Sequence, residues 1–392
     1  MLRILLILLT PLLLLALLEV AFENGIWEPL AQPMSHAGTS VHLKQALSDA
    51  SIPSVDYVTL GSSRPEYGLD HALLATTANQ AGRVHANLAM PGSHWLTIGL
   101  LAEWLQRAHP EVHGGIIALS IQDLINPGNG SYELGIVQPF RHFGDIGMVT
   151  EHVAFNRADV ATYGIYSALF GWRADIQEFV RHPFARKSVL HWFKHNRPPA
   201  YTLFENPESH GDMCAFGLDA ISACDKVDAS SDPERDGLKR QCKELRGNAV
   251  GRPDFGALAQ QKPLPDFMKR TRDIVQAQLR AIPWPKPPLV VLMPVPRIWT
   301  RDVLGTGLHE WALAILRPLA DEGRIHLIDA TDFFAPDADA GCSAFFDFYH
   351  QNALGRERLT HWLLPQVERF LYRDDPSRDT KTSAIPPTES SP

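Results

Sequence analysis

The chain has 392 residues, of which 45% are hydrophobic, and its 36 Lys and Arg residues are outnumbered by 44 Asp and Glu residues, which gives a formal net charge of −8. This apolar content is ample for a packed core and excludes a disordered chain, and the length allows one large domain or two smaller ones. The acidic balance and the lack of long Lys/Arg runs argue against a nucleic-acid backbone as a partner.

An apolar segment opens the chain and runs from Ile4 to Leu18, with Pro11 inside it. Arg3 is the only charge before this run, so the positive-inside rule keeps the N-terminus in the cytoplasm and sends the rest of the chain across the membrane. A cleaved signal peptide and an uncleaved anchor both fit, because the run is short for a spanning helix yet ends without a clear cleavage site. We favour a membrane anchor over residues 1–22 and an extracytoplasmic body, periplasmic or at the cell surface. A cleaved leader would make the protein secreted.

Four cysteines agree with an oxidising compartment. Cys214, Cys224 and Cys242 fall within one polar segment, whereas Cys342 stands alone far downstream. We expect a disulfide among the first three, and the sequence leaves open which of the three possible pairings the four cysteines adopt. The chain has no C-x-x-C pair and no ordered His/Cys cluster, so we expect neither a metal nor a cofactor.

The first ordered region alternates strands with helices. In chain order we expect strands at 56–60, 84–90 and 116–121, with an amphipathic helix at 95–106 between the last two. This alternation predicts an α/β fold built on a doubly wound, flavodoxin-like parallel sheet. In such sheets ligands bind outside the carboxyl ends of the strands.

The regularity ends at a dense turn cluster, residues 126–130, and the next clear strand is at 289–293. The segment between them is too long for a crossover, so we expect a large, mainly helical insertion over about 127–262. It begins with aromatic-rich stretches and continues with the polar part that carries three cysteines. It either covers the active-site edge of the sheet or forms a separate subdomain with no role in chemistry.

Regular structure returns after the insertion. We expect helices at 265–281, 309–322 and 354–371, and strands at 289–293 and 324–328. The sheet domain would then cover residues 50–372. The tail at 373–392 is charged and rich in Ser, Thr and Pro, so we expect it to be disordered.

Two short motifs almost three hundred residues apart can supply a catalytic triad. Residues 61–64 read Gly-Ser-Ser-Arg and follow the first strand, and residues 347–350 read Asp-Phe-Tyr-His and lie in a loop before the last helix. A serine hydroxyl is a weak nucleophile at neutral pH, so it needs a base within hydrogen-bond reach and that base needs a fixed tautomer. The two motifs can supply a serine nucleophile, Ser63 or its nearest rival Ser62, with His350 as the base and Asp347 as the residue that orients the base.

Amide groups near the strand ends can stabilise an oxyanion, each contributing a few kcal/mol. The expected donors are the backbone N–H groups of Ser63 and Gly92 and the side-chain amide of Gln122. Gln122 can instead hydrogen-bond a strand end, and Asn87 either contributes to the oxyanion site or has a structural role. Arg64 either binds an anionic substrate or makes a surface ion pair.

These blocks resemble those of the SGNH, or GDSL-type, hydrolase superfamily. That family has a Gly-Asp-Ser nucleophile block, a glycine block after the second strand, a Gly-x-Asn-Asp block after the third and a terminal Asp-x-x-His. The matching positions here are Gly61-Ser62-Ser63, Asn87 through Gly92, Ser120-Ile121-Gln122-Asp123, and Asp347 through His350. The resemblance spans the chain from Tyr57 to Leu371. Carried over by position, it implies that Ser63 rather than Ser62 is the nucleophile, that His350 is the base and Asp347 its orienting residue, and that Gly92 and Gln122 are oxyanion donors.

Three positions depart from the family pattern: Ser62 replaces an aspartate, Ser120 a glycine and Gln122 an asparagine. The Gly-Ser-Ser block, the glutamine and the N-terminal anchor look more like the membrane-tethered branch that includes the D-alanyl transfer protein of teichoic-acid modification. Periplasmic alginate O-acetyltransferases are more distant relatives. In that branch the resemblance implies acyl transfer to or from a cell-envelope polymer, often beside a membrane-bound O-acyltransferase.

We therefore expect an extracytoplasmic serine acyl-esterase or O-acyltransferase that acts on acyl esters of a cell-envelope or exported polysaccharide through an acyl-serine intermediate. Water as the acceptor gives a hydrolase, and a sugar hydroxyl gives a transferase. The alternatives are a non-catalytic polysaccharide-binding or assembly partner of a membrane-bound O-acyltransferase, and a secreted lipase. The expected partners are an acylated carbohydrate or other ester and, through the N-terminal helix, the membrane.

Overall fold

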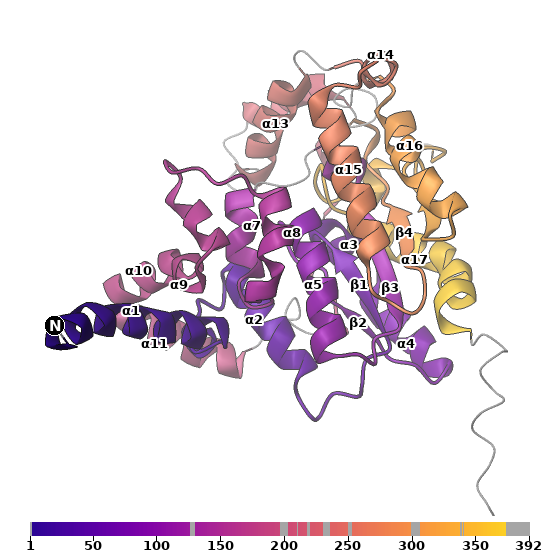
Figure 1. Ribbon diagram of the computed structural model, residues 1–392. Helices are drawn as coiled ribbons and strands as arrows, with labels where there is room; N and C mark the ends of the chain where they lie inside the picture. Colours follow the sequence, from indigo (N-terminus) through magenta and orange to yellow (C-terminus); the bar gives the residue numbers. More distant parts are fainter. Residues whose placement is uncertain are drawn as a thin grey trace, which may run out of the picture.

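A computed structural model of the chain has five parallel strands at its centre (Figure 1). They are β1 (Tyr57–Gly61), β2 (His85–Asn87), β3 (Gly114–Leu119), β4 (Leu289–Leu292) and β5 (His326–Asp329), in the spatial order β2-β1-β3-β4-β5. This is the flavodoxin-like order, and the predicted α/β class with an all-parallel sheet is confirmed. The structure describes residues 2–125, 130–196, 203–209, 211–217, 220–229, 236–249, 253–298, 306–337, 339 and 341–373.

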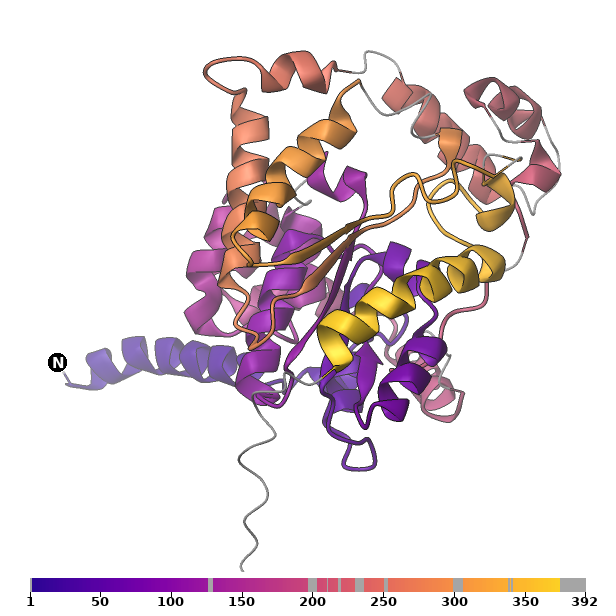
Figure 2. The same cartoon turned by 90° about the vertical axis from the view of Figure 1, so that its right-hand side faces the viewer.

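Helices cover both faces of the sheet (Figures 1 and 2). On one face lie α5 (Trp95–Ala108), α15 (Asp266–Ala281) and α16 (Leu308–Asp321). On the other lie α3 (Ser63–Gly68), α4 (His71–Gln80) and α17 (Ala353–Val367), which continues as the π-helical turn η10 (Glu368–Tyr372). Because a parallel sheet has both faces covered, its inner strands can be apolar throughout. All residues of β1, β3 and β4 are buried, whereas the edge strand β5 is partly exposed.

The strand ends differ in detail from the prediction. β2 is short, but the backbone amide of Met90 still donates to the Gly61 carbonyl at 2.9 Å, so extended pairing reaches the end of the predicted strand at 84–90. The predicted end of the third strand at 121 is wrong. β3 stops at Leu119 because Ser120 caps the next helix, α6 (Ile121–Ile125), and a capped helix start leaves the extended conformation.

The N-terminal segment is helical and its first part projects from the body (Figure 1). It comprises α1 (Leu2–Glu23), the 3-10 turn η1 (Glu28–Leu30) and α2 (His36–Leu47). The base of α1 is fastened where the Glu19 carboxylate accepts the backbone amide of Ala168 at 2.9 Å. Among the described residues no helix combines the length and the hydropathy that a membrane crossing requires. The membrane segment predicted over residues 1–22 is therefore not found.

In the outer half of the insertion, residues 130–195, the part at 130–152 packs beside α5 and the part at 168–171 packs against α1. Leu96 and Leu100 of α5 form a buried apolar cluster with Leu134 and Val149, so this half extends the core away from the sheet edge. Its elements are α7 (Gly130–Val137), η2 (Phe143–Asp145), α8 (Ile146–His152), η3 (Val160–Ile165), α9 (Ala168–Gly171), α10 (Arg173–Arg181) and α11 (Pro183–His195).

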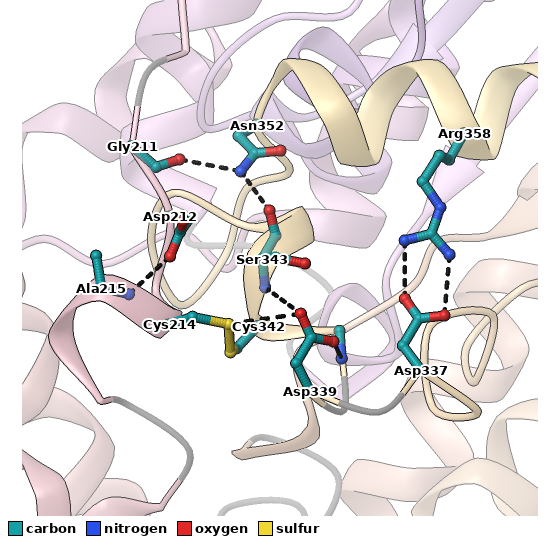
Figure 3. The surroundings of a disulfide bond; sticks show 11 residues. Gly211, Asp212, Cys214, Ala215, Asp337, Asp339, Cys342, Ser343, Asn352 and Arg358 are labelled. Atoms are coloured by element: carbon teal, nitrogen blue, oxygen red, sulfur yellow. Dashed lines mark hydrogen bonds and ion pairs between the residues drawn. A yellow bond between two sulfur atoms is a disulfide. The ribbon is translucent and has the colours of Figure 1, made fainter.

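The inner half of the insertion consists of the described residues between 203 and 259. Its elements are η5 (Cys214–Phe216), η6 (Ile221–Ala223), α12 (Cys224–Asp228), α13 (Asp236–Ala249) and α14 (Phe255–Ala259). A disulfide joins Cys224 to Cys242 within this half, so the expected bond among the first three cysteines is present. A second disulfide joins Cys214 to Cys342, 128 positions later (Figure 3).

The segment that follows β5 returns the chain to the sheet edge. We call residues 341–352, which include the turn η9 (Cys342–Ala344), the C-terminal loop. At its end Asn352 caps α17 by accepting the backbone amide of Gly355 at 3.0 Å. Of the tail predicted to be disordered, residues 374–392 lie outside the described residues.

Candidate active site

Three side chains meet at the carboxyl edge of the sheet in a hydrogen-bonded relay. The Ser63 Oγ lies 2.8 Å from Nε2 of His350, and Nδ1 of the same ring lies 2.9 and 3.0 Å from the two carboxylate oxygens of Asp347. An ionised carboxylate can only accept, so Nδ1 carries the proton and Nε2 accepts from the serine hydroxyl. The fold thus brings together the three residues of the predicted triad from positions up to 287 residues apart.

The carboxylate of Asp347 is well supplied with donors. The backbone amides of Tyr349 and His350 donate to its Oδ1 at 2.7 and 2.8 Å, and the side-chain amide of Gln241 donates to its Oδ2 at 2.9 Å. Burial by itself raises the pKa of Asp347, but the hydrogen bonds from His350, Gln241 and Tyr349 outweigh it and hold the pKa below its usual value. Asp347 is therefore charged at neutral pH.

Ser63 owes its position to the sharp junction between β1 and α3. Gly61 has a φ of +148°, and a Cβ there would collide with the Ala118 carbonyl and the Pro65 ring, so only glycine fits. The Oγ of Ser62 accepts the backbone amide of Arg64 at 3.4 Å and caps α3, whereas Ser63 faces His350. The two serines are thereby given different roles.

Arg64 follows Ser63 in the chain and is only 9% exposed. Its Nη1 donates to the Ser120 Oγ and lies 3.4 Å from an Asp123 carboxylate oxygen, and its guanidinium lies 5.6 Å from the centre of the Tyr349 ring. Asp123 in turn accepts the backbone amide of Ser120 at 2.7 Å. The ion pair expected on the surface is therefore buried, and it ties the segment after β1 to the segment after β3.

Gln122 has an amide that other side chains leave unused. Its Nε2 and Oε1 are buried, and neither has a hydrogen-bond partner in the part of the chain that the structure describes. Leaving a buried amide unpaired costs free energy, so such a group is a candidate ligand donor. Gly92, another of the expected donors, has a φ of +74°, and a Cβ there would approach the Tyr132 ring to 2.8 Å.

Asn87 has local hydrogen bonds that explain its presence without a ligand. Its Oδ1 accepts the backbone amide of Ala89 at 2.9 Å, and its backbone amide donates to the Leu203 carbonyl at 2.7 Å. These bonds hold the end of β2 and join it to the inner half of the insertion. Of the two roles considered for Asn87, the structural one has direct contacts to support it.

Sequence reasoning missed several residues around the triad. The rings of Tyr67 and Phe346 lie 5.1 and 5.5 Å from the His350 ring. Gln241, on α13, donates to Asp347 and also accepts the backbone amide of Phe348 at 3.2 Å through its Oε1. Phe346 adjoins the 347–350 motif and could have been noticed. Nothing in the sequence around Gln241 marks it as a partner of a residue 106 positions away.

One grouping of potential metal-ligating residue types occurs among the described residues. The ligand atoms of Cys214, Asp339 and Cys342 lie within 4.8 Å of one another. The two sulfurs are bonded to each other, however, and a disulfide offers no thiolate to a metal (Figure 3).

No protein-family model matches this chain, and no curated protein matches it in sequence. The arrangement at the sheet edge is a Ser–His–Asp relay, and Gln122 and Gly92 follow the neighbouring strands β3 and β2. Such a set is suited to nucleophilic attack on a carbonyl carbon.

Proposed function

We propose that this protein is a serine acyl-esterase or O-acyltransferase of SGNH type that acts outside the cytoplasm on acyl esters of a cell-envelope or exported polysaccharide. The observation that carries the proposal is the Ser63–His350–Asp347 relay, with 2.8 Å between nucleophile and base. Two disulfides support an oxidising compartment. The substrate class and a membrane-bound O-acyltransferase partner come from the family resemblance.

In the proposed mechanism the Ser63 oxygen attacks the ester carbonyl while His350 Nε2 takes its proton. The tetrahedral intermediate collapses as His350 returns that proton to the leaving alcohol, which leaves an acyl-serine. Asp347, held as an anion, stabilises the imidazolium formed between these steps. The backbone amides of Ser63 and Gly92 and the side chain of Gln122 would donate to the oxyanion.

The second half of the reaction repeats the first with a new acceptor. His350 takes a proton from water or from a sugar hydroxyl, whose oxygen attacks the acyl-serine, and the proton returns to the Ser63 oxygen as the acyl bond breaks. With water the product is a carboxylic acid, and with a sugar hydroxyl it is a new ester. The triad serves both outcomes equally.

A fluorophosphonate probe with intact-mass analysis tests the core of this proposal. We expect one adduct, located at Ser63, that is absent in Ser63→Ala and forms far more slowly in His350→Ala. In Ser62→Ala the adduct should still form at Ser63. A folded wild-type protein that gains no adduct would falsify the proposal and favour a binding or assembly role.

The acceptor can be identified with an acetyl ester as donor. The donor ester is mixed with an oligosaccharide in water. Release of acetate without acetylation of the oligosaccharide indicates a hydrolase, whereas an acetylated oligosaccharide formed in preference to acetate indicates a transferase. Ser63→Ala is the matched control in both assays.

A further inference from the structure

We infer that Gln241, in the inner half of the insertion, is a positioning residue that orients the Asp347 carboxylate, so that the insertion completes the catalytic relay. This inference rests on the proposed function, because it assigns Gln241 a task within the same triad. It also decides between the two roles considered for the insertion, a part of the active site or a subdomain without a role in chemistry.

The first observation is the way in which Gln241 spans the C-terminal loop. Its Nε2 donates to the Asp347 Oδ2 at 2.9 Å while its Oε1 accepts the Phe348 backbone amide at 3.2 Å. Both ends of the amide are thus engaged with consecutive residues. Exchanging its nitrogen and oxygen would place an acceptor against the carboxylate and a donor against the backbone N–H, so this arrangement fixes one orientation.

The second observation is the division of donors between the two carboxylate oxygens. Oδ1 of Asp347 receives both backbone amides, from Tyr349 and His350, whereas Oδ2 receives the Gln241 amide and shares the His350 Nδ1. Without Gln241 the imidazole would be the only donor to Oδ2 among these contacts. The carboxylate could then rotate about its Cβ–Cγ bond and carry the ring away from Ser63.

The third observation is that Gln241 is carried by a firmly held helix. Leu238, Cys242 and Leu245 of α13 are buried, and together with Gln241 they occupy the i, i+3, i+4 and i+7 positions of one helix face. Cys242 is bonded to Cys224 of α12. Burial raises the pKa of Tyr349, and the nearby carboxylate of Glu244, one turn further along the helix, raises it more.

The inner half also holds the start and the end of the C-terminal loop (Figure 3). Cys214 is bonded to Cys342, and the backbone amide of Met213 donates to the Phe345 carbonyl at 2.9 Å. At the far end, the Asn352 side chain donates to the Gly211 carbonyl at 2.9 Å. Gln241 therefore acts on the middle of a loop whose ends are attached to the same half of the insertion.

The test compares Gln241→Leu and Gln241→Glu with Lys243→Ala, a change of an exposed residue on the same helix. For each protein we would measure the rate of fluorophosphonate labelling at Ser63, kcat and KM for an acetyl ester, and the pH profile of kcat/KM. All rates are measured well below the melting temperature of the least stable variant, so that unfolding of a variant does not lower its measured rate.

For Gln241→Leu we expect a fall of about 10- to 100-fold in kcat and in the labelling rate, with KM little changed, as is typical when a partner that orients a functional group is removed. Gln241→Glu places a second carboxylate against Asp347, which favours the protonated imidazole, so the acidic limb of its pH profile should move to higher pH. Lys243→Ala should match the wild type.

The inference is overturned if the wild type is labelled at Ser63 while both Gln241 variants keep its rate and its pH profile. In that case the proposed function still stands and the insertion has no positioning role. Failure of the wild type to be labelled would instead defeat the proposed function, and this inference with it.

Discussion

The two sides of the relay are held in place by different means. On the side of Ser63, which we call the nucleophile side, Ser63 begins the helix that follows the buried strand β1, and its neighbour Arg64 is paired with Asp123 of α6, the helix after β3. On the base side, Asp347 and His350 lie in the C-terminal loop, which depends on bonds to the inner half of the insertion. The segments that directly follow β1 and β3 place Ser63, whereas Asp347 and His350 depend on the inner half of the insertion. Substitutions of the residues that support Asp347 and His350 should therefore reduce activity more than stability, and substitutions of the residues that support Ser63 should do the reverse.

The largest expected effect is on the base side, with Asp347→Asn. An amide at this position can present a donor to His350 and favour the wrong tautomer, so kcat/KM should fall by about 10³- to 10⁴-fold. Thermal unfolding should change little. The assay is hydrolysis of an acetyl ester, with a melting curve for the same sample. A residual rate within tenfold of the wild type would show that the relay does not limit the reaction.

On the nucleophile side, Arg64→Met removes the guanidinium but retains much of the length of the side chain. It leaves Asp123 buried without its cation, which should cost about 3 kcal/mol of unfolding free energy. Urea titration measures this. Asp123→Asn combined with Arg64→Met should recover part of the loss. A single variant as stable as the wild type would contradict the view that this pair secures the nucleophile side.

A third expected effect concerns Glu66, a buried residue of the helix that starts at Ser63. Burial raises its pKa from 4.5 to about 8. Between these values the folded protein retains a proton that the unfolded chain has released, so this group makes stability fall as pH rises from about 4.5 to about 8.

Glu66→Gln removes this titration. The variant should match the wild type near pH 4.5 and exceed it above pH 8, by up to roughly 5 kcal/mol, since each pKa unit corresponds to about 1.4 kcal/mol. Melting temperatures measured across this range test the prediction. An equal gap at every pH would mean that the substitution acts through packing instead.

The smallest expected effect is at the end of the C-terminal loop. Asn352→Ala removes the cap of α17 and the bond to the Gly211 carbonyl, which should cost about 1 kcal/mol and lower the labelling rate of Ser63 severalfold. Asp254→Ala removes the cap of α14, which lies away from the triad, and should lower stability slightly with no change in labelling. Equal labelling rates in the two variants would show that the hydrogen bonds of Asn352 do not help to position the triad.

The sheet and the residues that meet at its edge could be predicted from the sequence, whereas the end of β3 could not. Strand alternation predicted the parallel sheet, and the Gly-Ser-Ser and Asp-x-x-His motifs predicted the residues that meet at its edge, because each is a local pattern next to a regular element. The end of β3 was mispredicted because the capping pair Ser120 and Asp123 outweighs the apolar run.

The remaining site features are tertiary. Gln241 contributes through a hydrogen bond across 106 positions, and the burial of Arg64 depends on the packing of two loops against each other. Neither leaves a periodic pattern in the chain. The disulfide pairing could not be predicted from the cysteine spacing, because Cys214 and Cys342 are 128 positions apart and only the folded chain brings them together.

The bond between Cys214 and Cys342 has a mechanical consequence. It closes a ring of chain that contains β4 and β5 with their helices, so a force applied at the two ends of the oxidised molecule passes through the bond and bypasses this ring. Roughly 430 Å of contour length would stay hidden from the force until the bond is reduced. Under tension the force would pass through the parts of the chain that hold β1, β2, β3 and α17, whereas β4 and β5 would stay within the closed ring.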